Sequence, residues 1–83
     1  MRVLLFTGKN CPACGVMKKN LKKHNIYYEE IDVESQAGRK LSAMCHIKGI
    51  PMMFLFDGDV PIKGFTPGVI PERDLEKIKG KYL

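Results

Sequence analysis

The sequence predicts an α/β domain with element order β-α-β-α-β-β-α, a mixed four-stranded sheet flanked by helices. The chain has 83 residues, which fits one domain spanning positions 1–83. Short apolar or β-branched runs alternate with amphipathic stretches in the first half, which predicts a βαβ unit with parallel strands and a right-handed crossover. Near position 58, a turn sequence joins two further strand-like runs, which predicts an antiparallel hairpin at the end of the sheet.

The first strand and the first helix surround the sequence Cys-Pro-Ala-Cys at positions 11–14. The apolar run Val3–Phe6 predicts a buried strand, and Thr7–Asn10 follows as a loop. A helix is then expected from Pro12 to about His24. Its predicted inner face, spaced three and four residues apart, consists of Cys14, Met17 and Leu21.

A second strand is predicted over Ile26–Val33, which is rich in aromatic and β-branched residues. Ser35 is suited to cap the helix that follows. Apolar residues at helical spacing predict the buried stripe of this helix, and core packing is therefore the leading interpretation of Cys45. The stripe comprises Ala37, Leu41, Met44 and Cys45.

The segment Lys48–Pro51 ends that helix, and the continuous apolar run Met52–Phe56 predicts a strand covered on both faces. Val60–Gly64 is the expected hairpin partner, and Pro61 restricts it to the sheet edge because proline has no N–H for a ladder. After a loop, Ile70–Leu75 opens the last helix. The residues expected to face inward there are Leu75, Ile78 and Tyr82.

The placement of the two close cysteines at a helix start has a chemical consequence. Cys11 falls at the N-cap, and Pro12 occupies the first helical position, where a missing N–H costs nothing. A Cys11 thiolate can accept from the N–H at or near Cys14, which favours the thiolate; cysteines in such places have pKa values of roughly 3.5–7.5. We expect Cys11 to be the nucleophile and Cys14, more buried, to resolve the mixed disulfide.

Two other interpretations stay open at this stage. Cys11 and Cys14 are also half of a possible zinc site, which Cys45 and His46 would complete, although no second C-x-x-C or H-x-x-x-H pattern is present. The chain is alternatively a binding module in which the dithiol is idle. In the favoured interpretation, the protein needs no metal and no cofactor.

Charge and cysteine content indicate which binding partners and which cellular compartment to expect for this protein. The net charge is +5, and four lysines between positions 18 and 23 form a solvated helix face or a contact for an acidic protein. No aromatic residues interleave with them, so nucleic acid is not expected. The N-terminal apolar run is too short for a signal peptide, and no stretch spans a membrane. We therefore expect a cytoplasmic protein, in which a stable structural disulfide is unfavourable, and the odd number of three cysteines also argues against a disulfide framework.

Three motifs together resemble the thioredoxin/glutaredoxin superfamily over nearly the whole length. They are Cys-Pro-Ala-Cys between a strand and a helix, Lys-Gly-Ile-Pro at 48–51, and Asp-Gly-Asp at 57–59. The short chain and the proline after the first cysteine resemble glutaredoxin. Gly-Phe-Thr-Pro at 64–67 is similar to small glutaredoxin-like thioredoxins that thioredoxin reductase reduces and that serve ribonucleotide reductase.

The resemblance implies a thioredoxin fold, a cis Ile50–Pro51 bond and a loop that lies against the dithiol, where it blocks metal binding. Ile50 and Pro51 would then pair with an extended substrate segment, and the region Gly64, Phe65 and Thr66 would contribute to substrate binding. The implied activity is that of a protein disulfide reductase and electron carrier in cell redox homeostasis. Thioredoxin reductase or glutathione would supply electrons, and a monomer is expected.

Two departures from classical thioredoxin affect the chemistry. The chain has no tryptophan, and its first strand, Val3–Phe6, contains no acid. Proton transfer to and from Cys14 must therefore use water, Lys9 or another group. Lys9 stands close to Cys11 in the sequence and is expected to lower the pKa of its thiol. Lys9, Pro12 and Pro51 are thus the residues expected to support the two cysteines.

Overall fold

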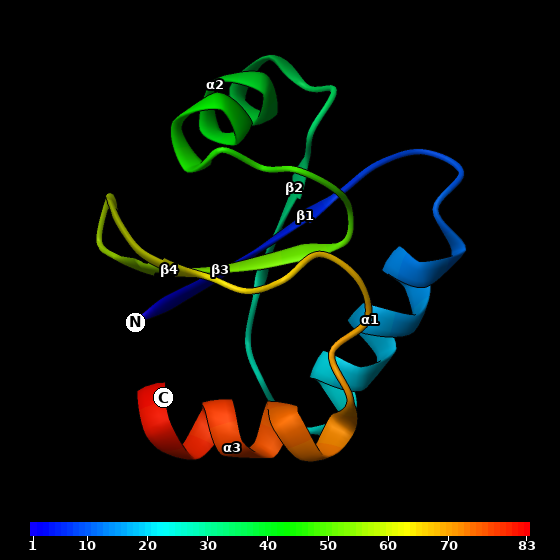
Figure 1. Cartoon of the computed structure of the whole chain (residues 1–83), viewed down its shortest axis with the longest axis vertical. Helices are drawn as coiled ribbons and strands as arrows, with labels where there is room; N and C mark the ends of the chain where they lie inside the picture. The colour runs from blue at the N-terminus through cyan, green and yellow to red at the C-terminus, as the bar shows by residue number, and fades with distance from the viewer.

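A computed structural model describes residues 1–83 and shows the predicted order β-α-β-α-β-β-α (Figure 1). The sheet has four strands in the order β2-β1-β3-β4. The strands are β1 (Arg2–Thr7), β2 (Glu29–Asp32), β3 (Met52–Asp57) and β4 (Val60–Gly64), and the helices are α1 (Pro12–Lys23), α2 (Gln36–Cys45) and α3 (Glu72–Tyr82).

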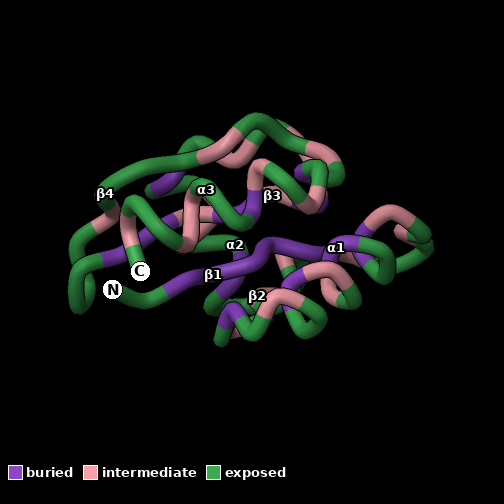
Figure 2. Tube along the Cα trace, turned by 90° about the horizontal axis from the view of Figure 1, so that it is seen from below, coloured by how far each residue is buried: buried purple, intermediate pink, exposed green.

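Strand β1 lies in the interior of the sheet and pairs on both sides. It is parallel to β2, with Leu5 opposite Glu30, and antiparallel to β3, with Leu5 opposite Met53. In Figure 2, the trace of β1 is coloured as buried along almost its whole length. Strand β4 forms the predicted hairpin edge, and an irregularity in its register lies near Pro61, which cannot donate to the ladder.

Alternating residues of β1 pack into two hydrophobic cores on opposite faces of the sheet. Val3 and Leu5 pack with residues of α1 and α3, including Met17, Leu21 and Leu75. Leu4 and Phe6 pack on the other face beneath α2. Figure 1 shows this layering, with α2 on one side of the sheet and α1 and α3 on the other.

The second strand is shorter than the predicted Ile26–Val33. Ile26 is buried in the core, but it precedes the strand, and its N–H donates to the carbonyl of Leu21 at 2.9 Å. Asn25 before it has a φ of 56°. This left-handed residue ends the helical path, so the chain is still turning at Ile26 and pairs with β1 only from Glu29.

The predicted inner stripe of the second helix is partly wrong. Leu41 and Cys45 pack toward the core, but Ala37 and Met44 are exposed, Met44 by 47%. Gly38 takes the inner position instead, because a Cβ there would lie only 1.7 Å from the carbonyl oxygen of Asp32. The Ser35 side chain caps this helix as predicted, accepting from the Gly38 N–H at 2.9 Å.

None of the helices is long and apolar enough to cross a lipid bilayer.

Candidate active site

The two close cysteines lie at the start of α1 and are joined as a disulfide, with their Cα atoms 5.3 Å apart. Cys11 is the N-cap residue, and its Sγ accepts a hydrogen bond from the Cys14 N–H at 3.1 Å. Pro12 occupies the first helical turn, as the sequence predicted. Cys11 is half-buried, whereas Cys14 is only 3% exposed. Cys11 is therefore the sulfur that a large partner can approach.

The Ile50–Pro51 peptide bond is cis, as the resemblance implied. Pairing of Phe6 with Met52 sets Pro51 across from the end of β1, where the chain leaves for Cys11. A Cβ at Gly8 would lie 2.7 Å from Cδ1 of Ile50, so the loops 8–10 and 48–51 are in contact. The cis-proline loop, residues 48–51, therefore borders the loop that leads to Cys11.

The loop that follows β4 closes over the same region. The Gly68 N–H donates to the Pro51 carbonyl at 2.8 Å. A Cβ at Gly49 would meet Cβ of Pro67 at 3.2 Å. The loops around positions 8, 50 and 67 thus form one continuous surface at this end of the sheet.

A polar cluster that the sequence pattern did not reveal lies on the α1 face of the sheet. The buried Thr7 hydroxyl donates to Oε2 of Glu30 at 2.8 Å, and the Lys18 ammonium pairs with the same carboxylate at 3.2 Å. The Thr7 hydrogen bond, followed by Lys18, holds the pKa of Glu30 below its usual value. Lys18 lies one turn beyond Cys14 on the same helix.

The sequence contained a signal for this cluster. Period-two alternation places Tyr28 and Glu30 on one face of the second strand, the face that packs toward α1. Glu30 lies at the margin of that face, where its side chain stays 44% exposed while it contacts Thr7 and Lys18.

The other predicted site residues differ in how close they lie to this surface. Lys9 is exposed in the loop before Cys11. Gly64 pairs with Phe54 in the hairpin. The Phe65 ring packs against the core and meets Tyr82 edge-on, with centroids 6.2 Å apart. Thr66 is exposed, so the side chain of Thr66 is more available to a ligand than the ring of Phe65.

The four residues of the alternative metal site do not come together. Cys45 is buried in the core beneath α2, on the face of the sheet opposite α1, and burial raises the pKa of its thiol. His46 is exposed and adopts a left-handed conformation at the end of α2, a capping position. The structure groups no three histidine, cysteine or carboxylate side chains in a way that suits a metal ion.

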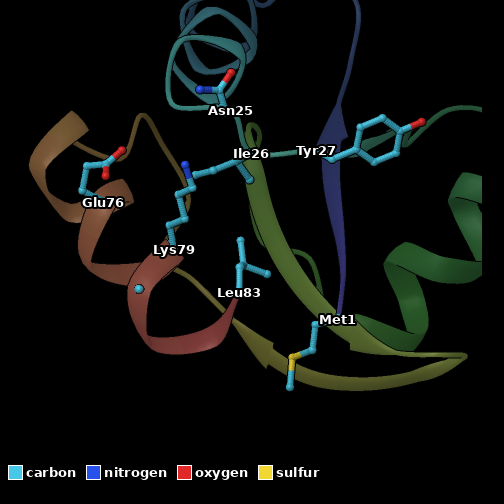
Figure 3. A pocket seen from close by; sticks show the side chains of 8 residues that line it. Met1, Asn25, Ile26, Tyr27, Glu76, Lys79 and Leu83 are labelled. Carbon is cyan, nitrogen blue, oxygen red and sulfur yellow. The ribbon is translucent and has the colours of Figure 1, made fainter.

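Four hollows on the surface are large enough to receive part of a ligand, and one of them, of about 300 Å³, lies where Lys22 on α1 faces Tyr28 and Glu30. A hollow of about 630 Å³ lies between α3 and the residues after α1, where Lys79 and Leu83 face Asn25 and Ile26 (Figure 3). Two smaller ones line the surface described above. One of about 490 Å³ lies between the loop 65–71 and α3, and one of about 270 Å³ lies beside the cis-proline loop.

Comparison with known proteins agrees with this geometry. The glutaredoxin family model matches residues 3–60. A mutant thioredoxin from Halobacterium salinarum superposes with a TM-score of 0.79 at 18% identity, covering 96% of this chain and 72% of that chain. Thioredoxin 1 from Thermosipho africanus superposes with a TM-score of 0.71 at 21% identity, covering 99% and 93%. No curated protein matches the sequence.

At these identities the structural likeness concerns the fold, a thioredoxin fold with a mixed four-stranded sheet flanked by three helices. The family match covers both cysteines and the cis-proline. The paired cysteines at the helix start support a thiol–disulfide oxidoreductase. The chain belongs to the glutaredoxin family, within the thioredoxin/glutaredoxin superfamily.

Proposed function

We propose that the protein reduces protein disulfides through a reversible Cys11–Cys14 pair, with Cys11 as the nucleophile and Cys14 as the resolving thiol. The observation that carries this proposal is the hydrogen bond from the Cys14 N–H to Cys11 Sγ at 3.1 Å. It stabilises a thiolate on the more exposed sulfur, at the positive end of the α1 dipole.

The exchange has two steps that balance in atoms and electrons. The Cys11 thiolate attacks one sulfur of the substrate disulfide, forms a mixed disulfide and releases the other sulfur as a thiolate. Cys14 loses its proton and attacks Cys11 Sγ, which releases the second substrate thiolate and leaves the Cys11–Cys14 disulfide. The substrate gains two electrons, and a donor dithiol or two small thiols return two electrons to the pair.

The neighbouring loops supply a place for the substrate chain. We propose that an extended substrate segment pairs with the backbone at Ile50 and lies over Pro51, with Gly64, Phe65 and Thr66 along its path. The contact between Gly8 and Ile50 supports this arrangement, because it keeps the cis-proline loop beside the nucleophile's loop. Such pairing adds a short strand to an exposed backbone edge.

The electron donor is either thioredoxin reductase or glutathione, and disulfide-containing proteins such as ribonucleotide reductase are the proposed substrates. We propose a monomer that acts in the cytoplasm, where a reducing environment maintains dithiols. No metal or cofactor takes part in the proposed exchange.

The test is NADPH oxidation during reduction of a protein disulfide, run in parallel with thioredoxin reductase and with glutathione plus glutathione reductase. We expect turnover in at least one arm, and loss of that turnover in Cys11→Ser. The Cys45→Ser protein is the matched control, since Cys45 lies on the other side of the sheet and should retain activity. Equal turnover of the wild type and Cys11→Ser would refute the proposed role of Cys11.

A further inference from the structure

The buried thiol of Cys14 has to lose a proton in the second step of the proposed exchange. Cys14 is only 3% exposed, and burial disfavours a charged thiolate, so the charges around it decide how easily the thiolate forms. Strand β1 contains no acid, and its buried polar residue, Thr7, is uncharged. The charges that act on Cys14 must therefore come from other elements.

Lys18 carries one such charge toward Cys14. It lies one helical turn beyond Cys14 on the same face of α1. A side chain on a helix points back over the preceding turn, which for Lys18 is the turn that begins at Cys14. The contacts of Lys18 agree with this direction, because its ammonium lies 3.2 Å from Oε2 of Glu30, the oxygen that also accepts from the Thr7 hydroxyl.

The packing of α1 on β1 places Thr7 at the level of Cys14. Helix α1 joins the end of β1 to the start of the parallel strand β2, so it runs back along β1. Leu5 of β1 packs in one core with Met17 and Leu21 of α1. Toward the active site, Thr7 is the next residue on that face of β1, and Cys14 is the next buried residue of α1. The polar cluster therefore lies beside the turn that holds the buried thiol.

We infer that Lys18 and Glu30 are positioning residues that set the acidity of the Cys14 thiol by two opposed charges. The Lys18 ammonium favours the Cys14 thiolate, and the Glu30 carboxylate opposes it. Cys14 thus stays a thiol while Cys11 attacks the substrate, and it can still lose its proton once the mixed disulfide has formed. The inference rests on the proposed disulfide exchange and adds two residues to its second step.

The remaining charges near this end of the sheet are exposed, so water screens them more strongly. They are Lys9 in the loop before α1, Lys22 on α1, Asp32 at the end of β2 and Lys48 in the cis-proline loop. On α3, Glu72 and Glu76 face His24 at the far end of α1. The contacts with Thr7 and Lys18 keep the Glu30 carboxylate ionised, since both lower its pKa. The pair of Lys18 and Glu30 is therefore a fixed source of charge beside Cys14.

The test is a titration of Cys14, followed by the chemical shift of its Cβ in protein labelled with ¹³C at cysteine. Cys11→Ser is the background, because it leaves position 11 uncharged, as in the mixed disulfide. Lys18→Met should raise the pKa of Cys14 and Glu30→Gln should lower it, and each should change the thiolate fraction at neutral pH roughly threefold. The double variant should return close to the background, since both charges are gone.

Matched variants separate this effect from repacking and from the net charge. Lys19→Met removes the same charge from an exposed neighbour on α1 and should leave the titration nearly unchanged, whereas Lys18→Arg should keep the background value. The differences should shrink in about 0.5 M sodium chloride, because salt screens partly exposed charges. Shifts of the same sign in Lys18→Met and Glu30→Gln, or an equal effect of Lys19→Met, would overturn the inference.

A kinetic readout separates failure of this inference from failure of the proposed function. The reduced Cys45→Ser protein reacts with 4,4′-dithiodipyridine, an uncharged disulfide, and releases one thiopyridone when Cys11 attacks and a second when Cys14 resolves the mixed disulfide. At about pH 6, Lys18→Met should slow the second release roughly threefold and change the first much less. An equally fast second release in Lys18→Met would refute the inference alone, whereas no second release in the parent protein would refute the proposed exchange.

Discussion

Gly38 sits where α2 passes closest to the end of β2. A Cβ at this position would lie 1.7 Å from the carbonyl oxygen of Asp32, a backbone atom that cannot rotate away. Gly38→Ala should therefore lower the free energy of unfolding by about 1–3 kcal/mol, as overpacking does. Gly80→Ala is the matched control, since nothing lies within 4 Å of its added Cβ, and it should stabilise α3 by about 0.5–1 kcal/mol. Urea unfolding of both variants checks the pair, and equal effects would contradict the packing argument.

Lys9 is the charged residue nearest to Cys11 in the connecting loop, and its side chain is exposed. A cation near a thiolate stabilises the charged form, so Lys9→Ala should raise the pKa of Cys11 and slow its alkylation by iodoacetamide near pH 6.5. Peptide mapping of the reduced protein measures the rate at Cys11 alone. Lys63→Ala serves as control, because Lys63 lies on β4. An unchanged rate in Lys9→Ala would show that the helix start alone activates the sulfur.

At the scale of elements, His24 ties the end of α1 to α3. Its Nε2 lies 2.7 Å from Oε1 of Glu72, and its Nδ1 bonds to Oε2 of Glu76. Lys23 also pairs with Glu72, and the Lys79 ammonium donates to the His24 carbonyl. The hydrogen bond to Glu72, followed by that to Glu76, raises the pKa of His24, because both carboxylates favour the imidazolium.

The sign of the resulting pH dependence follows from that direction. Because the pKa of His24 is higher in the folded state, its stabilisation is complete below the unfolded pKa of about 6.5 and is lost as pH rises through the folded pKa. The difference in melting temperature between the wild type and His24→Gln should therefore be largest near pH 5.5 and shrink toward pH 9. Parallel curves across that range would show that the imidazolium contributes nothing to the link between α1 and α3.

At the scale of the whole molecule, β1 supports both cores. Leu5 of β1 is fully buried and packs against α1 and α3. Leu5→Ala should therefore lower the free energy of unfolding by about 2–5 kcal/mol. Tyr27 is 91% exposed, and Tyr27→Ala should change stability by less than about 0.5 kcal/mol. Thermal or urea unfolding compares the two. A small effect of Leu5→Ala would mean that packing around β1 contributes little to the free energy of unfolding.

Much of this architecture is legible in the sequence because the decisive signals are local. The strand-to-helix placement of Cys11, the cap at Ser35 and the hairpin near Gly58 depend on a few neighbouring residues, and the structure has all three. The inner face of α2 was predicted less well. Apolar spacing favoured Met44, whereas the close approach to β2 requires the glycine at position 38, and only the tertiary contact reveals that requirement.

The surroundings of the site depended on contacts that no local pattern contains. The Thr7–Glu30–Lys18 cluster joins two strands and a helix, and its members are far apart in the sequence. The hollow of about 270 Å³ beside the cis-proline loop likewise combines Val33, Ser42 and Ile50, which belong to three segments. The motif identified the cysteine pair, but only the folded chain brings together the groups that surround the proposed substrate path.

The most direct test of the central claim is a trapping experiment with Cys14→Ser. The reduced variant is mixed with a disulfide peptide, quenched with acid and mapped by mass spectrometry. Because the second step is blocked, we predict that a peptide adduct accumulates on Cys11 and that Cys11→Ser, under the same conditions, gains none. An adduct on Cys45, or no adduct on a folded and reduced Cys14→Ser protein, would contradict the assignment of Cys11 as the nucleophile.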